Sequence, residues 1–218
     1  MLVSILIPTL LERLSTYSPM VEDLYKQIKD NKLEDKVEII SICDNRTIPL
    51  VEKRNHLQKL ARGKYFTHLD DDDKFASDYC KRVVDHIESL EDNIDIIAYD
   101  QKCFVEDDIF ITTPHANAPL QLIEPHEKYN LKSFYRFPWQ FHLFHKRFIE
   151  VYRTDSDSPD KINKPAMYDD LNWLKKVQLE YPEKMSIIQD WIGHEYHFEK
   201  GVSGSTTQQG GKLSKNNQ

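Results

Sequence analysis

The sequence predicts an α/β fold with a mostly parallel sheet and helices on both of its faces, and two patterns carry this prediction. Short apolar runs rich in β-branched residues alternate with longer segments whose apolar residues recur at helical spacing. Polar residues follow directly after these runs, where open parallel sheets bind their ligands. The 218 residues are enough for one substantial core, or for one domain with a smaller lobe.

Four strands are expected in the first half of the chain. Each is a short run of β-branched or aromatic residues, and they span residues 2–7, 37–42, 65–69 and 94–99. Pro8 is expected to stop the first of them, because proline has no N–H to donate to a strand ladder.

Three helices are expected between these strands. The first has Ser18 as N-cap and Pro19 at the first helical position, and runs to about Asn31. Thr47 and Pro49 open the second, which Gly63 stops. The third follows a run of aspartates and has apolar residues at helical spacing, namely Tyr79, Val83, Val84, Ile87 and Leu90.

The second half is a smaller and less regular region. Two apolar segments, 103–105 and 109–112, predict a β-hairpin, and an aromatic stretch with several histidines follows at 134–148. Asp169 and Asp170 lead a later helix. We therefore expect a first half at 1–100, a second half of the same domain at 101–200, and a Gly/Ser-rich tail or linker to a further domain at 201–218.

Composition excludes some classes of function. The formal charge of −7 argues against a nucleic-acid partner, and suggests that any bound phosphate would need a metal ion. Cys43, Cys80 and Cys103 are odd in number and lie in apolar runs, so buried free thiols in a reducing compartment are expected. The apolar opening is too short to span a bilayer and lacks the features of a signal peptide, so we expect no transmembrane segment and a cytosolic chain.

Four consecutive aspartates, Asp70 to Asp73, follow the third strand. Carboxylates this close repel one another unless a positive charge lies among them, and Mg2+ or Mn2+ is held by one or two carboxylates plus substrate phosphates. A continuing strand would point Asp70 and Asp72 to one face and Asp71 to the other. The alternative is an acidic turn before the following helix.

The carboxyl ends of neighbouring parallel strands meet at one edge of a sheet, so three polar segments are expected to converge. They are Pro8-Thr9, Asp44-Asn45-Arg46 and the aspartate run. Asp44 is either a turn residue or a carboxylate that accepts the N–H of a uracil or the hydroxyl groups of a ribose.

On these residues the sequence resembles the nucleotide-sugar glycosyltransferases of the GT-A (Rossmann-like) fold, in particular glycosyltransferase family 2. The resemblance covers about the first 100 residues well and the remainder at isolated positions. It rests on VSILIPT at 3–9, EIISICDNR at 38–46, KRNHLQKLARGKYFTHLDDDD at 53–73 and YDDLNWLKK at 168–176. One identity that fits is the N-terminal domain of a virus-encoded, multidomain member.

The resemblance implies roles for individual residues. The donor-binding residues it implies are Pro8, Thr9, Asp44, Arg54, Asn55, Asp70 and Asp71. Asp72 is the implied direct ligand of Mn2+ or Mg2+, with Asp70 nearer the ribose or a metal-bound water. Asp170, beside Asp169, is the implied general base that deprotonates the acceptor hydroxyl.

Histidine and aromatic residues leave two interpretations open. His194 and His197 lie where this family brings a late side chain back to the metal, although a packed or surface histidine is the commoner case. If this segment is a strand, His197 lies on the same side as Glu195. Trp139 and His142 suit either an acceptor sugar ring or a hydrophobic core.

The function expected from the resemblance is metal-dependent transfer of a sugar from a UDP-sugar donor to a hydroxyl group of a glycan or other acceptor. A catalytically silent nucleotide-sugar or carbohydrate-binding domain is the non-enzyme alternative. A sugar-nucleotide pyrophosphorylase needs a Gly-rich loop after the first strand, and residues 8–14 contain no glycine. A haloacid-dehalogenase phosphatase needs an Asp-x-Asp-x-Thr pattern, and the aspartate run is followed by Lys74.

Overall fold

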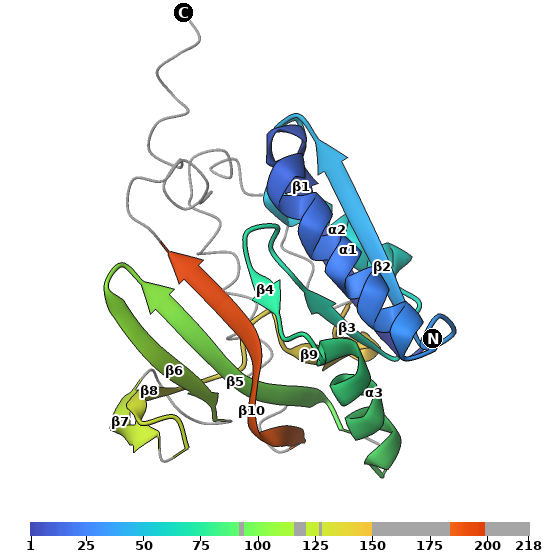
Figure 1. Ribbon diagram of the computed structural model, residues 1–218. Helices are drawn as coiled ribbons and strands as arrows, with labels where there is room; N and C mark the ends of the chain where they lie inside the picture. The colour runs from blue at the N-terminus through green and yellow to red at the C-terminus, as the bar shows by residue number, and fades with distance from the viewer. Residues whose placement is uncertain (92–93, 116–120, 127, 150–183, 199–218) are drawn as a thin grey trace, which may run out of the picture.

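The structure is a computed structural model that describes residues 1–91, 94–115, 121–126, 128–149 and 184–198 (Figure 1). Asp169, Asp170 and the helix expected after them lie outside the described residues, as does the tail at 201–218.

The described residues form strands and helices in alternating order through the first half (Figure 1). The helices are α1 Leu14–Asp30, α2 Leu50–Leu60 and α3 Tyr79–Ser89, with short 3-10 turns at Leu11–Arg13 and Lys146–Ile149. The strands are β1 Val3–Leu10, β2 Val37–Asp44, β3 Tyr65–His68, β4 Lys74–Phe75, β5 Ile96–Val105, β6 Asp108–Pro114, β7 Gln121–His126, β8 Leu131–Arg136, β9 Leu143–His145 and β10 Met185–Phe198.

The strands of the described chain form one sheet with the order β2-β1-β3-β9-β5-β6-β8-β7, and β10 pairs with β4 and β5. β1 pairs in parallel with β2 and β3. β9 lies antiparallel between β3 and β5, so β5 runs in the same direction as β3. The predicted α/β class with a mostly parallel central sheet is confirmed, and β9 is an inserted strand that the sequence pattern did not predict.

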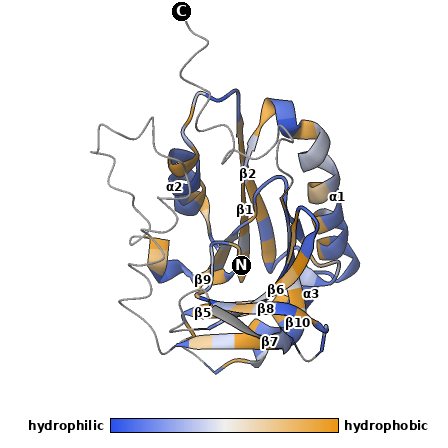
Figure 2. Ribbon diagram, turned by 90° about the vertical axis from the view of Figure 1, so that its left-hand side faces the viewer, coloured by the Kyte–Doolittle hydropathy of each residue, from blue (hydrophilic) through white to orange (hydrophobic). Residues whose placement is uncertain are grey.

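Helices cover both faces of the first part of the sheet, as predicted. In Figure 2, α2 lies on one side of β1 and β2, and α1 and α3 lie on the other. Neighbouring residues of β1 point to opposite faces, so Ile5 packs with Leu24 of α1, whereas Leu6 packs with Leu57 of α2. Burial on both faces explains why β1 is apolar almost throughout.

β1 continues past Pro8 to Leu10, so the predicted stop at Pro8 is wrong. The Leu6 carbonyl accepts a 3.0 Å hydrogen bond from Leu69 N–H, so Leu6 faces β3 and so does Pro8, two residues later. The paired part of β3 has ended at that level. Pro8 therefore occupies a position where the missing N–H removes no ladder bond.

α1 begins at Leu14, so the prediction of Ser18 as its N-cap is wrong. A 3-10 turn leads directly from β1 into α1, and Pro19 lies inside the helix. The proline costs one backbone hydrogen bond early in α1, while Leu24 and Ile28 anchor the helix in the core. Tertiary packing therefore overrides the local start signal.

Gly63 is needed for close packing, whereas the prediction made it the stop of α2. The helix ends at Leu60. A Cβ atom on Gly63 would lie 2.6 Å from the Tyr65 carbonyl oxygen and 2.7 Å from Ser4 N. Only glycine therefore lets this loop pass so close to β1.

Other predicted features are confirmed. α3 buries Tyr79, Val83, Val84 and Ile87, and β5 and β6 form the hairpin at the predicted place. Cys80 and Cys103 are buried and free, but Cys43 is exposed, so its predicted burial is wrong. Within the described ranges, no helix has the length and apolar character needed to cross a membrane.

Candidate functional site

The carboxyl ends of β1, β2 and β3 meet at one edge of the sheet. Leu10 at the end of β1 is in register with Asp44 at the end of β2. The Thr9 hydroxyl donates a 2.7 Å hydrogen bond to Oδ2 of Asp71, which follows β3. The structure thus brings together the polar segments that the sequence analysis expected to converge.

The aspartate run forms a turn, so the predicted alternation of its side chains is wrong. Asp73 N–H donates to the Asp70 carbonyl at 3.1 Å, which closes the turn. Asp71 and Asp72 consequently face the same guanidinium, that of Arg13. Local hydrogen bonding, which strand periodicity does not describe, sets the directions of these carboxylates.

Arginine side chains reach the aspartate run from two elements. Arg13, in the 3-10 turn after β1, forms an ion pair with Asp71 and lies 3.4 Å from Asp72. Arg54, which is almost fully buried in α2, places Nη2 2.9 Å from Asp70 Oδ1. The negative net charge of the whole chain therefore does not describe this edge of the sheet, where two arginines are present.

Arg13 was not predicted as a site residue from the sequence. The signal that could have identified it was its place directly after a strand.

The remaining carboxylates of the run lack full compensation. Partial burial, followed by repulsion from Asp70 and Asp73, raises the pKa of Asp72 to about 7, although its side chain is 39% exposed. Burial and repulsion from Asp70 also raise the pKa of Asp73 well above its ordinary value. Full ionisation of the turn would therefore put more negative charge there than Arg13 and Arg54 balance.

The described residues contain no group of three or more His, Cys, Asp or Glu side chains that could cage a metal ion. Mg2+ usually keeps several waters and takes one or two carboxylates plus substrate phosphates, so a full protein cage is not required. Asp72, exposed and poorly compensated, suits such an open position. The donor set therefore fits a divalent cation that a substrate helps to hold.

Asp44 closes the turn from β2 into α2. Its Oδ2 accepts backbone N–H groups of Thr47 and Ile48, at 2.6 and 2.7 Å, and its Oδ1 pairs with Lys53. Burial opposes ionisation here, but the Lys53 ammonium and these hydrogen bonds outweigh it and lower the pKa of Asp44 to about 2. Lys53 also donates to the Thr9 carbonyl at 2.8 Å, so this residue, also missed from sequence, joins the two strand ends.

His194 reaches the aspartate run from β10. Its Nδ1 lies 3.0 Å from Gln101 Nε2, and its Nε2 lies 3.3 Å from Asp73 Oδ2. Because the amide donates to Nδ1, the ring proton belongs on Nε2, facing Asp73. Burial lowers the pKa of His194 to about 3, so the ring is neutral.

His197 follows the predicted strand alternation, since its Nε2 lies 3.7 Å from Glu195 Oε2 on the same side of β10. Its ring stacks on Phe104 with centroids 4.5 Å apart. Of the two histidines, His194 is therefore the one in contact with the aspartate run.

Trp139 and His142 lie between β8 and β9. His142 is buried, and its Nε2 lies 3.0 Å from the Tyr99 carbonyl, while Trp139 N–H donates to Nδ1 at 2.8 Å. These contacts suit a core histidine. Trp139 is half-buried and packs against both hydrophobic clusters. Asn55, beside Arg54 on α2, is half-buried as well.

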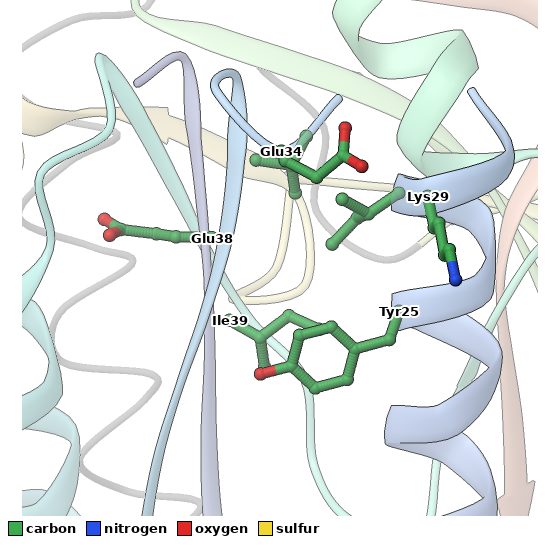
Figure 3. A pocket seen from close by; sticks show the side chains of 7 residues that line it. Tyr25, Lys29, Glu34, Glu38 and Ile39 are labelled. Carbon is green, nitrogen blue, oxygen red and sulfur yellow. The ribbon is translucent and has the colours of Figure 1, made fainter. Parts of the chain in front are cut away.

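A cavity elsewhere in the molecule is distinct from this edge. Figure 3 shows Tyr25 and Lys29 of α1 opposite Glu38 and Ile39 of β2, around a space of about 400 Å³. Glu38 and Ile39 lie near the amino end of β2, whereas the candidate site lies at the carboxyl end. The cavity therefore has no part in the site.

No family model matches the chain, and no curated protein matches it either. Solved structures do match. TarS 1-349 of S. aureus in complex with UDP shares 14% identity at a TM-score of 0.60, over 91% of this chain and 61% of that one. TarS 1-349 in complex with UDP-GlcNAc shares 14% identity at a TM-score of 0.56, over 92% and 60%. This chain thus spans about three fifths of the length of these structures.

Sheet order, flanking helices and these similarities define an α/β fold of the GT-A glycosyltransferase type, as the sequence resemblance implied. At 14% identity the likeness to TarS concerns the fold.

Proposed function

We propose that this protein is a glycosyltransferase that moves a sugar from a UDP-sugar donor to a hydroxyl group of a glycan or other acceptor. The observation that carries the proposal is the convergence of Thr9, Asp44 and the aspartate turn at the carboxyl ends of β1, β2 and β3. This is where open α/β sheets bind nucleotides. The likeness to a protein solved with UDP and with UDP-GlcNAc supports the choice of donor.

The nucleoside is expected to lie over the ends of β1 and β2. Pro8, Thr9 and Asp44 would contact the base, and Asp70 and Asp71 the ribose, with Arg54 and Asn55 beneath them on α2. Lys53 and Arg54 position Asp44 and Asp70 through their ion pairs. Because these cations are nearly fully buried, the carboxylates are held before the donor arrives.

Asp72, with Asp70 beside it, is the proposed holder of Mn2+ or Mg2+; His194 is the closer of the two histidines to this position. A bound cation would neutralise the diphosphate of the donor as it leaves. The poorly compensated charge of the aspartate turn supports this assignment.

In the transfer step, an acceptor hydroxyl oxygen forms a bond to the anomeric carbon while the bond from that carbon to the diphosphate oxygen breaks. UDP leaves with the electron pair, and the hydroxyl proton passes to a carboxylate base. Asp170, with Asp169 beside it, remains the proposed base. Trp139 remains the proposed acceptor platform, and the buried His142 is expected to support it from the core.

The ion pairs of Arg13 and Arg54 with the aspartate turn favour a second candidate function. Asp70 and Asp71 already have cationic partners without any metal, which suits a domain that binds a nucleotide sugar and does not turn it over. Measuring transfer and donor hydrolysis separates this candidate from the first.

Calorimetric titration with UDP-sugars, with and without Mn2+, tests the proposal. We expect binding of a uridine diphosphate sugar that chelation of divalent cations weakens strongly. Undiminished binding after exhaustive chelation would remove the metal from the proposal, and preference for a purine nucleotide would remove the base assignment. A thermal-shift panel of nucleotide sugars identifies the preferred donor, since a ligand of the native state raises the unfolding midpoint.

A further inference from the structure

Arg136, at the end of β8, has an unusual set of contacts. Its guanidinium carbon lies 4.2 Å from the centroid of the Trp139 ring. Its Nη1 reaches Gln101 Oε1 at 3.5 Å, the limit of a hydrogen bond. That oxygen already accepts a 2.9 Å bond from Thr112 Oγ1. The guanidinium therefore has an aromatic face and one weak polar contact.

This cation has no counter-charge in the described part of the chain, where no carboxylate forms an ion pair with it. Burial lowers the pKa of Arg136 to about 10, which reflects the same lack of compensation. Removing a charged group from water without a partner is unfavourable. An oxyanion from outside the chain would supply the missing partner.

Arg82 of α3 offers a comparison within the same molecule. It also lies over a tryptophan, with its guanidinium carbon 5.5 Å from the Trp191 ring centroid. Unlike Arg136, it has the Asp78 carboxylate 3.8 Å away. Both arginines pack on a tryptophan ring. Arg82 has a carboxylate beside its guanidinium, whereas Arg136 has none among the described residues.

A short series of contacts joins Arg136 to the aspartate turn. Gln101, which Arg136 touches, lies 3.0 Å from His194 through its amide nitrogen. His194 in turn lies 3.3 Å from Asp73. Gln101 and His194 are register partners on β5 and β10, so these two side chains lie on the same face of the sheet. Arg136 is therefore two side chains away from the aspartate turn, where the donor is proposed to bind.

We propose that Arg136 is a phosphate-binding position beside the donor site, with the Trp139 ring as the platform that holds its guanidinium. The planar guanidinium fork binds two phosphate oxygens at once. The phosphate has two sources, the diphosphate of the donor or a phosphate group on the acceptor. The proposal depends on the proposed function only for the identity of the neighbouring site.

The test compares Arg136→Gln with the wild type, and uses Arg82→Gln as the matched control. One series titrates UDP and uridine with Mn2+ present, because uridine lacks the phosphates. The other titrates inorganic phosphate without a divalent cation, first into the free protein and then into protein saturated with UDP. Loss of a charge-assisted pair is expected to weaken binding roughly 10-fold or more.

Each outcome has one meaning. Weaker UDP binding with unchanged uridine binding in Arg136→Gln supports the proposal and identifies the donor as the source. Unchanged UDP binding with loss of phosphate binding to the UDP-saturated protein supports it and identifies an acceptor phosphate. Equal binding in every titration overturns the proposal, as does an equal loss for uridine and UDP.

Two further measurements keep the proposal testable. If Arg136→Gln does not fold, Arg136→Lys keeps the charge but loses the planar fork, and the same titrations should show a several-fold weakening. In the wild type, the Arg136 Nε–H resonance should shift on addition of phosphate or UDP, and an unmoved resonance contradicts the proposal. Failure of the wild type to bind UDP contradicts the proposed function alone, because phosphate titration of the free protein still decides the role of Arg136.

Discussion

Arg13 is the cation that contacts the exposed side of the aspartate turn. Its guanidinium contacts Asp71, which is 3% exposed, and Asp72, which is 39% exposed. Removing the arginine would leave the buried Asp71 carboxylate without a cationic partner, with the hydrogen bond from the Thr9 hydroxyl remaining. Breaking a buried pair in this way is costly, because one charge stays in the interior uncompensated.

We expect Arg13→Gln to lower the free energy of unfolding by about 2–4 kcal/mol and to weaken donor binding. Lys26→Gln is the control, because Lys26 is 75% exposed and its partner Asp30 is 57% exposed, and such surface pairs contribute little to the free energy of unfolding. Urea unfolding of both variants is the measurement. Equal stability losses would mean that Asp71 finds another partner.

Asp72 is the residue on which metal dependence is expected to rest. Asp72→Asn keeps the side-chain shape and removes one negative charge from a repulsive cluster, so the apo fold should be as stable as the wild type or more stable. Mn2+-dependent binding of a UDP-sugar should fall substantially. Calorimetry checks this, with Asp85→Asn on the exposed face of α3 as control. Wild-type binding by Asp72→Asn would refute its role as metal ligand.

β9 and the loop before it show how one element fixes others. β9 lies between β3 and β5, and His142 directly before it bonds to the Tyr99 carbonyl of β5. Thr67 of β3 donates to the Phe141 carbonyl at 2.8 Å in the same loop. This loop therefore joins β3 to β5 and, through them, the first half of the domain to the second.

Low pH should destabilise the native protein through His142 in this loop. Burial lowers the pKa of His142 from 6.5 to about 3, so between these values the unfolded chain binds a proton that the native protein does not. The free energy of unfolding then falls as pH falls from about 6.5, by at most about 1.4 kcal/mol per pH unit. His142→Gln should be less stable at pH 7 but have a shallower pH slope. Urea unfolding between pH 7 and 4 measures this, with His56→Gln, exposed on α2, as control. An unchanged slope would show that His142 titrates alike in the native and unfolded states, which contradicts a lowered pKa.

At the scale of the whole molecule, the sheet presents two sets of polar side chains from different strands. The carboxyl ends of β1 to β3 present Thr9, Asp44 and the aspartate turn, while β5, β8 and β10 present Gln101, Arg136 and His194. The two sets touch where His194 meets Asp73. This arrangement suits a donor on the first set and an acceptor reached from the second.

Asp170→Asn should leave donor binding nearly intact and lower transfer to the acceptor by roughly 100-fold or more, the scale of a lost general base. Asp169→Asn is the neighbouring control and should retain more activity. Transfer and donor hydrolysis need separate assays in both variants. Equal loss of donor binding and turnover in Asp170→Asn would indicate a structural or metal-binding role, and no loss would leave Asp170 as a helix-end charge.

The sequence by itself determined the class of the fold and the location of the polar edge. The strands around Ile5 and Phe66, the helix with Val83, and the hairpin at Val105 all follow from local periodicity, because burial of one or two faces imposes a repeat on the residues. The convergence of Thr9 with the aspartate run followed from strand order, since parallel strands end at a common edge.

Only the tertiary structure decided the features that depend on partners distant in sequence. β1 passes Pro8 because β3 ends beside it, and α1 starts before Ser18 because its later residues pack into the core. Arg13, 58 residues away from Asp71, became its partner through the meeting of two strand ends. Local patterns encode which face a residue buries, but they do not encode which charge it will meet across the sheet, and for this reason the ion pair of Arg13 with Asp71 followed only from the tertiary structure.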